Sequence, residues 1–320
     1  MEKVKCNLCG SENHQVVYLM PDRLYFNDEW FNVVECKDCG LGFVNPRPAY
    51  SEIFRYYPPS FYENFDKERN YHERRYKAQS KFLSDITKGQ EKKILLDVGC
   101  ANGDFPRYMQ NIGWEVEGVE VSPNSKPISD FKVYNQEFTD IPIHEAYYDA
   151  ITAWAVLEHV HNPMSYFRKA AEVLKPGGFF VFLVTNFESI SSKNLFREDL
   201  PRHLYFFTEK TVKEYLEKSG FELIRSDYSD KIYSMRPVNW LRYYVYRYLK
   251  KHNLKWEDIP LTRIEYFNKN KLNKNLWSNL QYAVSQNPFT LVDIMLMPLF
   301  EKYQMLSKSY GIVTYIATKH

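Results

Sequence analysis

ILLDVGCANGDFPRYMQNIGWEVEGVEVSP, residues 94–123, is the stretch that decides the fold of this chain. Its first residues are mostly apolar and lead into a turn with glycines at 99 and 103, which predicts a buried strand followed by a tight loop. Residues 105–111 then predict a short helix that stops near Gly113, and residues 114–121 predict a second strand. Glu120 lies near the end of that strand. This order of elements is typical of a nucleotide site at the carboxyl edge of a parallel sheet.

The residue types within this unit restrict the ligand. Gly99 and Gly103 allow the backbone to approach a ligand closely, and the carboxylate of Glu120 can accept hydrogen bonds from both hydroxyls of a ribose. The glycine spacing is not that of a dinucleotide site, and no Gly-Lys-Ser/Thr of a P-loop follows. Asp97 would repel a pyrophosphate but could hold a cationic amino group. A ribose site without a phosphate cradle suggests S-adenosylmethionine.

The segments DVGCANGDF and VEGVEVSP resemble motif I and the following strand of class I S-adenosylmethionine-dependent methyltransferases. The family usually has G-x-G-x-G, and this chain has the small residue Ala101 at the middle position. The resemblance implies an α/β fold with a Rossmann-like seven-stranded sheet. It also implies cofactor-binding roles for Asp97, Gly99, Ala101, Gly103 and Glu120. The alternative is an ordinary β-α-β unit with turn glycines.

Further segments extend the resemblance over about residues 95–228. They match the family in order. YDAITAW at 148–154 is the expected fourth strand, and AVLEHV at 155–160 follows it. LKPGG at 174–178 is a stop before the expected fifth strand at 179–184, and PRHLYFFT at 201–208 comes before the expected sixth strand at 221–228. The resemblance also predicts a closing strand at 311–318, antiparallel and at the edge of the sheet.

The same resemblance adds residues around the cofactor. Glu137 stands where the family places a carboxylate at the adenine amino group, and Phe138 where the next backbone amide meets a ring nitrogen. A solvated loop is the alternative for both. Trp154 or Ala155 would flank the methionine moiety.

Two histidines are candidate catalytic residues on the acceptor side. His203 ends a long polar loop that follows the fifth strand, so we prefer it as the general base for an acceptor hydroxyl. His159, in the V-L-E-H segment, is the other candidate. A structural, hydrogen-bonded histidine is the alternative for each.

Four of the five cysteines form two C-x-x-C-G knuckles near the N-terminus: Cys6, Cys9, Cys36 and Cys39. Two such pairs are typical of a tetrahedral structural Zn²⁺ site, because the glycine lets backbone amides turn toward the sulfurs. Two disulfides are the alternative, and a reducing cytosol disfavours them. We expect a zinc-ribbon module over residues 1–48 with strands near 18–20 and 30–34 and a small core of its own. A closed four-cysteine site predicts no catalytic role.

The remaining boundaries follow from the same motifs. Residues 49–90 are expected to form a linker and a packing helix at 70–86, and residues 91–230 the methyltransferase core. Residues 231–310 are expected to form a helical insertion, and residues 311–320 the closing strand.

Composition and charge narrow the class of protein. The 320 residues include 44% hydrophobic and 26% charged residues, as in a globular α/β protein. The net charge of +2 is too small to indicate a nucleic-acid partner. The start of the chain lacks the apolar stretch of a signal peptide, and no apolar run is long enough to span a membrane. We therefore expect a cytoplasmic location, at most peripheral to the inner membrane face.

The insertion at 231–310 is the most basic part of the chain. Residues 231–320 hold 14 Lys or Arg against 5 Asp or Glu, so the rest of the chain is acidic. Apolar residues recur at helical spacing over 241–249, and a second apolar patch at 289–300 is expected to be broken by Pro298. Such helices can lie on anionic membranes, form a lid or form a homodimer interface, and ordinary packing is the preferred interpretation.

The zinc module together with these motifs resembles bacterial sugar methyltransferases. The resemblance implies methyl transfer from S-adenosylmethionine to oxygen or carbon of a small-molecule acceptor, above all a nucleotide- or lipid-linked sugar or a glycan-pathway intermediate. An rRNA or tRNA methyltransferase is one alternative, disfavoured because the Asn/Asp-Pro-Pro-Tyr/Phe and Pro-Cys motifs are missing. A non-catalytic, cofactor-binding zinc-ribbon protein is another.

Overall fold

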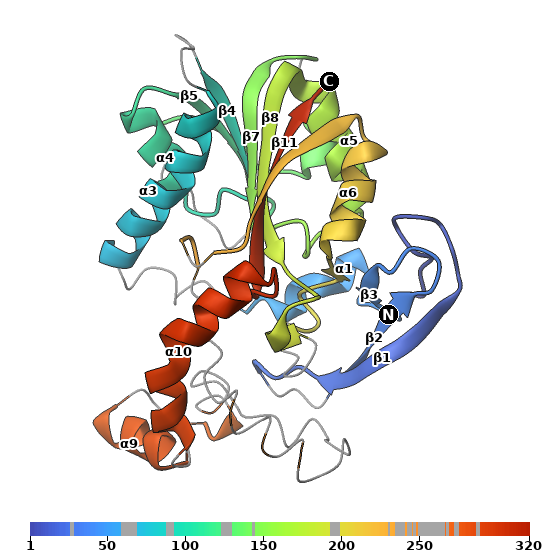
Figure 1. The fold of residues 1–320 in the computed structure, drawn as a ribbon. Coiled ribbons are helices and arrows are strands. Elements are labelled where there is room, and N and C mark those ends of the chain that lie inside the picture. Colours follow the sequence, from blue (N-terminus) through green and yellow to red (C-terminus); the bar gives the residue numbers. More distant parts are fainter. Residues whose placement is uncertain are drawn as a thin grey trace.

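The computed structural model describes residues 1–25, 29–58, 69–87, 93–122, 130–142, 145–192, 199–229, 231–233, 241, 245, 248, 266, 269–271, 275–285 and 289–320. Its centre is a seven-stranded sheet with the strand order β10-β11-β8-β7-β4-β5-β6 (Figure 1). The strands are β4 (Ile94–Val98), β5 (Glu115–Val119), β6 (Lys132–Tyr134), β7 (Tyr148–Trp154), β8 (Leu174–Thr185), β10 (Phe221–Asp227) and β11 (Ile312–Lys319). The predicted Rossmann-like α/β sheet is confirmed.

The closing strand does not lie at the edge of the sheet, so that part of the expectation is wrong. Strands β6, β5, β4, β7 and β8 are parallel, whereas β11 runs antiparallel between β8 and β10. The burial patterns give the reason: residues 312–317 of β11 are all buried, whereas β10 exposes polar residues such as Glu222. The more apolar strand takes the inner position because it is covered on both faces.

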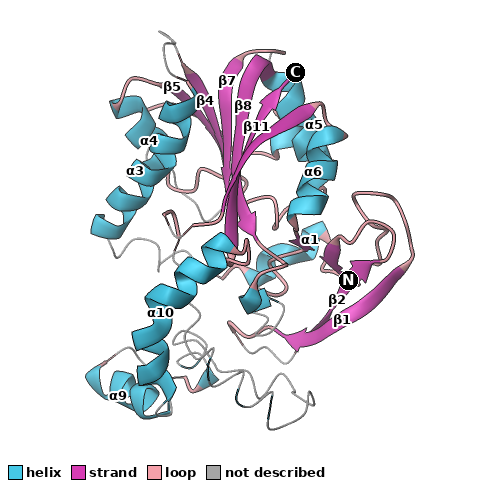
Figure 2. Cartoon of the chain, in the orientation of Figure 1, coloured by secondary structure: helices cyan, strands magenta, loops and turns pink. Residues whose placement is uncertain are grey.

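Helices cover both faces of the sheet. Figure 2 shows α3 (Arg69–Ile86) and α4 (Asp104–Asn111) on one face, with α5 (Pro163–Val173) and α6 (Glu209–Glu217) on the other. Local caps set where these helices begin. The side chain of Asn162 accepts a hydrogen bond from the Ser165 amide at the start of α5, and Thr208 forms a capping box at the start of α6.

The LKPGG segment is part of β8 rather than a turn before it. Tyr148 of β7 pairs with Leu174, but Ala150 pairs with Phe179, so the residues between 174 and 179 bulge out of the ladder. Gly177 has a φ of +74°, which such a bulge requires. Regular pairing therefore begins at Phe179, where the fifth strand was expected to begin.

The N-terminal residues form a second, four-stranded sheet with the order β1-β2-β3-β9. It consists of β1 (His14–Pro21), β2 (Trp30–Cys36), β3 (Gly42–Val44) and β9 (Tyr205–Phe206). The two strands expected between the cysteine pairs are confirmed and are longer than expected. The last strand, β9, belongs to the segment after β8, so the cysteine module and the methyltransferase core share a sheet.

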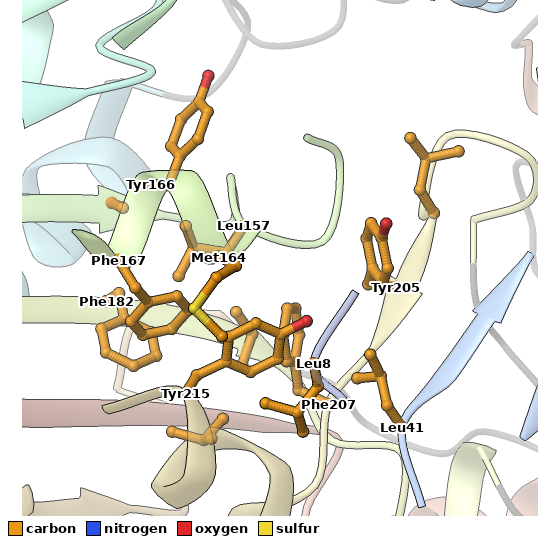
Figure 3. Packing of buried hydrophobic residues seen from close by; sticks show 14 of the residues in the cluster. Leu8, Leu41, Leu157, Met164, Tyr166, Phe167, Phe182, Tyr205, Phe207 and Tyr215 are labelled. Carbon is orange, nitrogen blue, oxygen red and sulfur yellow. The ribbon is translucent and has the colours of Figure 1, made fainter. Parts of the chain in front are cut away.

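The expectation that the module has a core of its own is wrong. Leu8 and Leu41 of the module belong to the same buried cluster as Phe167, Phe207 and Tyr215 of the core (Figure 3). Polar contacts join the same surfaces, since Asn7 accepts hydrogen bonds from the Met164 amide at 3.0 Å and the Tyr215 hydroxyl at 2.9 Å. A module this small buries little apolar surface alone and is stabilised by sharing a core.

The remaining described elements are α1 (Tyr50–Ile53), two 3₁₀ turns at Phe54–Tyr56 and Phe138–Asp140, α9 (Leu276–Ser285) and α10 (Phe289–Leu306). Helix α10 continues through Pro298, so the expected break is wrong. Most of the apolar pattern at 241–249 lies outside the described residues. Among the helices that the structure describes, none combines the length and hydropathy needed to cross a bilayer.

Candidate active site

A cavity of about 360 Å³ opens where β4, β5 and β7 end, within the size range of small-molecule sites. Its lining comes from the turn after β4, the end of β5, the segment after β7, and helices α1 and α3. The sequence-predicted residues among the lining are Asp97, Gly99, Ala101, Glu120, Glu137, Trp154 and His159. Gly103, Phe138 and His203 are not part of the lining.

Glu120 is held in place by backbone amides. One oxygen of its carboxylate accepts a hydrogen bond from the Ala101 amide at 2.9 Å, and the other accepts one from the Ser122 amide at 2.7 Å. Burial raises the pKa of this carboxyl, and these amide contacts oppose the rise. Each oxygen keeps further acceptor capacity, so the carboxylate can also receive two hydroxyl donors from the cavity.

Asp97 is almost fully buried at the end of β4, with an exposed fraction of 2%. The hydroxyl of Thr152 donates to its carboxylate at 2.6 Å. Burial raises the pKa of Asp97 to about 7, while the Thr152 hydrogen bond and the nearby Arg75 lower it. A buried carboxylate at the cavity wall gains most from a cationic partner, as an amino group of a ligand would provide.

The turn after β4 has a left-handed backbone. Gly99 and Gly103 have φ values of +72° and +79°, and Ala101 between them has +48°. A Cβ on Gly99 would lie 2.6 Å from Cγ2 of Val156, so this glycine is needed to let the β7 segment pack against the turn. Gly103 is the N-cap of α4. The glycines therefore shape the cofactor loop, and the clash at Gly99 is with the protein rather than with a ligand.

Glu137 faces the cavity between two tyrosines. Its carboxylate accepts hydrogen bonds from the Tyr50 hydroxyl at 2.8 Å and from the Tyr166 hydroxyl. Burial, with Glu137 as the next cause, raises the pKa of Tyr50 to about 12, so this phenol stays protonated. The side chain of Phe138 is buried and contacts Tyr166 edge to face, with ring centroids 5.4 Å apart.

Trp154 offers an unused donor at the end of β7. Its ring meets Phe105 edge to face with centroids 5.6 Å apart, which fixes its orientation. Nε1 is buried, and among the described residues it has no hydrogen-bond acceptor. A buried N–H that lines a cavity is a donor for a bound ligand. Together with Glu120 and Asp97, it fits S-adenosylmethionine, which carries a carboxylate, an amino group and ribose hydroxyls.

The two candidate histidines lie side by side, with ring centroids 4.7 Å apart. His159 reaches the cavity, and its Nδ1 lies 3.0 Å from the carbonyl oxygen of Arg202 and 2.9 Å from the hydroxyl of Tyr57. Burial, followed by the nearby His203, lowers the pKa of His159 to about 3. His159 is therefore neutral at physiological pH. The ring of His203 packs against His159 and is not part of the cavity lining.

Several lining residues were missed from the sequence. Tyr57 stands in a segment that we expected to be a linker, and the Tyr-Tyr-Pro-Pro composition there was its only signal. Arg75 and Tyr76 extend from α3, which packs on the core through Phe82 but also lines the cavity. The guanidinium of Arg75 lies over the ring of Tyr233, 4.4 Å from its centroid. Helix α3 is therefore both a packing helix and part of the site.

The four N-terminal cysteines converge as predicted. Their sulfurs lie within 4.8 Å of one another, with Cys6 and Cys39 at 3.4 Å and Cys9 and Cys36 at 3.5 Å. All are free thiols, so the structure gives no support to the disulfide alternative. Sulfur ligands of one tetrahedral Zn²⁺ lie about 3.8 Å apart, given Zn–S bonds of about 2.3 Å. The cluster fits that geometry.

Comparison with known proteins adds to this geometry. Residues 69–226 match the family described as "Methyltransferase domain". The chain is 30% identical over 156 residues to the ubiquinone biosynthesis O-methyltransferase of Azoarcus sp. (strain BH72), covering 42% of this chain and 67% of that protein. It is also 30% identical over 115 residues to the protein of that name from Shewanella halifaxensis (strain HAW-EB4), covering 33% of this chain and 49% of that protein.

Among solved structures, a SAM-dependent methyltransferase from Archaeoglobus fulgidus aligns with a TM-score of 0.47 at 17% identity, over 77% of this chain and 94% of that one. The family match spans β4, β5, β7 and helix α3 of the cavity wall, whereas α1 lies outside it. From this match, together with the order of the sheet and the acidic groups at its carboxyl edge, it follows that the chain belongs to the S-adenosylmethionine-dependent methyltransferases.

Proposed function

We propose that the protein methylates a hydroxyl group of a small-molecule acceptor, above all a sugar or a glycan-pathway intermediate. The observation that carries the proposal is the mixed lining of the cavity. Acidic groups and the left-handed turn lie at the ends of β4 and β5, and the lining also includes Tyr57, His159 and His161. The acidic groups and the turn suit the cofactor, and the tyrosine and the histidines suit a polar acceptor. The O-methyltransferase names of the relatives support oxygen as the acceptor atom.

The proposed cofactor contacts follow from the acidic side chains and the tryptophan of the lining. Glu120 would accept the ribose hydroxyls and Asp97 would pair with the amino group. Glu137 would accept from the adenine amino group, and Trp154 Nε1 would donate to the carboxylate. The cofactor supplies an electrophilic methyl group when bound, so the protein mainly has to orient the acceptor and remove its proton.

On the acceptor side, His159 and His203 stay as proposed groups with different tasks. His159 reaches the cavity and would contact the acceptor. His203 does not line the cavity, so it would act through His159 as a positioning residue rather than as a base in direct contact.

We also propose that Cys6, Cys9, Cys36 and Cys39 hold a structural Zn²⁺. The sulfur geometry and the left-handed turns at Gly10 and Gly40, with φ of +78° and +86°, support the proposal. X-ray absorption spectroscopy at the zinc edge of the purified protein should reveal sulfur neighbours at about 2.3 Å from the metal. A spectrum that contains only oxygen or nitrogen neighbours would contradict it.

The segment 231–310 is proposed to carry a contact surface for a membrane, a second copy or the acceptor. One face of α10 exposes an apolar stripe, and the opposite face buries polar residues such as Asp293 and Gln304. The stripe consists of Val292, Met295, Leu296, Leu299, Tyr303 and Leu306. Sedimentation of the wild type, with and without anionic vesicles, shows whether it binds vesicles or associates with itself. Replacing Met295 and Leu299 by Glu should abolish the association that the wild type displays. Unchanged association of the double variant would refute a role for the stripe.

The acceptor class can be tested with purified enzyme and methyl-labelled cofactor. We expect label in nucleotide- or lipid-linked sugars and none in rRNA or tRNA. Label found only in RNA would move the assignment to the alternative class, and methyl groups found on carbon would replace O-methylation by C-methylation.

A further inference from the structure

Three side chains that commonly ligate metals converge beside the cavity, at His159 of its lining. They are Glu158, His159 and His203, and each offers one ligand atom within 4.8 Å of the others. Glu158 is fully buried, and the two imidazoles are partly buried. The turn after β7 supplies the first two, and the segment before β9 supplies the third. The Leu204 amide joins these segments by donating to the carbonyl oxygen of Glu158 at 2.7 Å.

The hydrogen bonds of His159 prepare one nitrogen to act as a ligand. Nδ1 lies 3.0 Å from the carbonyl oxygen of Arg202, which can only accept, so Nδ1 must carry the proton. Nε2 then keeps its lone pair. A ring N–H donated to a backbone carbonyl is the usual support of a metal-bound histidine, because it fixes the tautomer and the ring orientation.

Charge around the cluster favours a cation. Arg202 is fully buried, and its guanidinium binds both Asp22 at 2.9 Å and Asp199 at 2.6 Å. One positive charge thus faces two carboxylates. Both Asp199 and Arg202 act electrostatically on His159, so these charges are close to the cluster. A carboxylate such as that of Glu158 is a common ligand of divalent cations.

From this geometry we infer that Glu158, His159 and His203 form a second metal site, which binds a divalent first-row cation such as Zn²⁺. Two imidazoles and one carboxylate are a catalytic ligand set that leaves a coordination position open. Ligands of one tetrahedral ion lie about 3.4 Å apart for bonds of about 2.1 Å, so small rotations of the three side chains would close the set.

The role of this site rests on the proposed function. Because His159 reaches the cavity, the open position lies on the acceptor side. An acceptor hydroxyl bound there would lose its proton to water more readily. The resulting oxygen would form the new O–C bond while the C–S bond of the sulfonium breaks and sulfur keeps the electron pair. The site also accounts for the proximity of His203 to His159, although His203 does not line the cavity.

The test is the zinc content of the protein after equilibrium dialysis against Zn²⁺. We expect wild-type protein to hold one zinc ion more per chain than Glu158→Gln and His203→Gln. His161→Gln is the matched control, because this histidine lies in the same segment but bonds the Pro48 carbonyl instead, and it should keep the wild-type content. A Cys6→Ser, Cys9→Ser variant should lose only the ion of the cysteine cluster. S-adenosylmethionine binding by calorimetry verifies that each variant is folded.

Equal zinc content in wild type and both cluster variants would overturn the second site. That result would leave the methyltransferase proposal intact, because cofactor binding and methyl transfer are measured separately. Conversely, a difference of one ion in a protein that methylates no hydroxyl acceptor would support the metal site and remove its proposed role.

Discussion

Glu120 is fixed before any ligand arrives, since two backbone amides already hold its carboxylate. Glu120→Ala should weaken S-adenosylmethionine binding by about 1–3 kcal/mol, as for a lost charge-assisted hydrogen bond. Isothermal titration calorimetry measures this change. Glu115→Ala, at the exposed start of the same strand, is the control and should bind as the wild type does. Equal affinity of a folded Glu120→Ala protein would remove the ribose assignment.

Asp97 predicts a pH dependence of cofactor binding. Its pKa of about 7 means that the carboxyl is largely protonated below neutral pH in the free protein. Only the ionised form can pair with an amino group, so affinity should rise as the pH increases through about 7 and then level off. Asp97→Asn should bind weakly at every pH and lose this dependence. A wild-type affinity that is flat from pH 6 to pH 8 would contradict the pairing.

The same residue predicts a pH dependence of stability without cofactor. An unfolded aspartate has a pKa near 3.9, and the folded value is higher, so the folded state binds more protons between these two values. The free energy of unfolding should therefore fall as the pH rises from about 4 to about 7. Asp97→Asn should raise it at pH 8 by about 2–4 kcal/mol. Chemical denaturation of both proteins at pH 5 and pH 8 measures these effects. If Asp97→Asn raised the free energy of unfolding more at pH 5 than at pH 8, the assignment would be refuted.

Among the elements, the turn after β4 sets the packing of β7 on the cofactor loop. Gly99→Ala should lower the free energy of unfolding by about 1–3 kcal/mol, because it combines a positive φ with a 2.6 Å contact to Val156. Gly113→Ala separates the two causes, since Gly113 has a φ of +94° but no atom within 4 Å of its Cβ position.

Adding Val156→Ala to Gly99→Ala should recover the part of the loss that comes from the clash. Equal losses in the Gly99 and Gly113 variants, with no recovery in the double variant, would show that backbone strain alone is responsible.

Local sequence patterns predicted most of the elements. The strand Tyr148–Trp154 and helix α3 could be located because apolar periodicity and turn residues are local signals. The position of β11 was missed because pairing with both β8 and β10 depends on which strand is more apolar on both faces. The continuation of α10 through Pro298 was missed because a proline disfavours a helix interior without excluding it.

At the scale of the whole molecule, the cysteine module and the methyltransferase core share one hydrophobic cluster and one sheet. Removing the proposed Zn²⁺ from the cysteines should therefore lower the melting temperature of the entire chain in a single transition. Calorimetry with and without a chelator measures this effect, with Cys100→Ser as a control, because Cys100 is outside the cluster. Two separate transitions, with only the first shifted, would show that the module unfolds on its own.

The sequence predicted only part of the candidate site, because some of its residues are positioned by tertiary packing rather than by local sequence signals. Motif residues such as Glu120 and Trp154 could be located because they lie where strands end at one sheet edge. Tyr57, Arg75 and His161 could not, because they reach the cavity only through tertiary packing of α1, α3 and the segment after β7. The contact of His203 with His159 likewise depends on how β9 joins the cysteine module.

The central claim is that the cavity holds S-adenosylmethionine beside a small acceptor whose hydroxyl group receives the methyl group. Its most direct test is mass spectrometry of cell extracts incubated with the protein and a cofactor that carries a deuterated methyl group. We predict that the label enters a small hydroxyl-bearing molecule through an O–CH₃ bond, and that Glu120→Ala forms far less of this product. Cofactor bound stoichiometrically with no labelled product, or label found only in RNA or on carbon, would contradict the account.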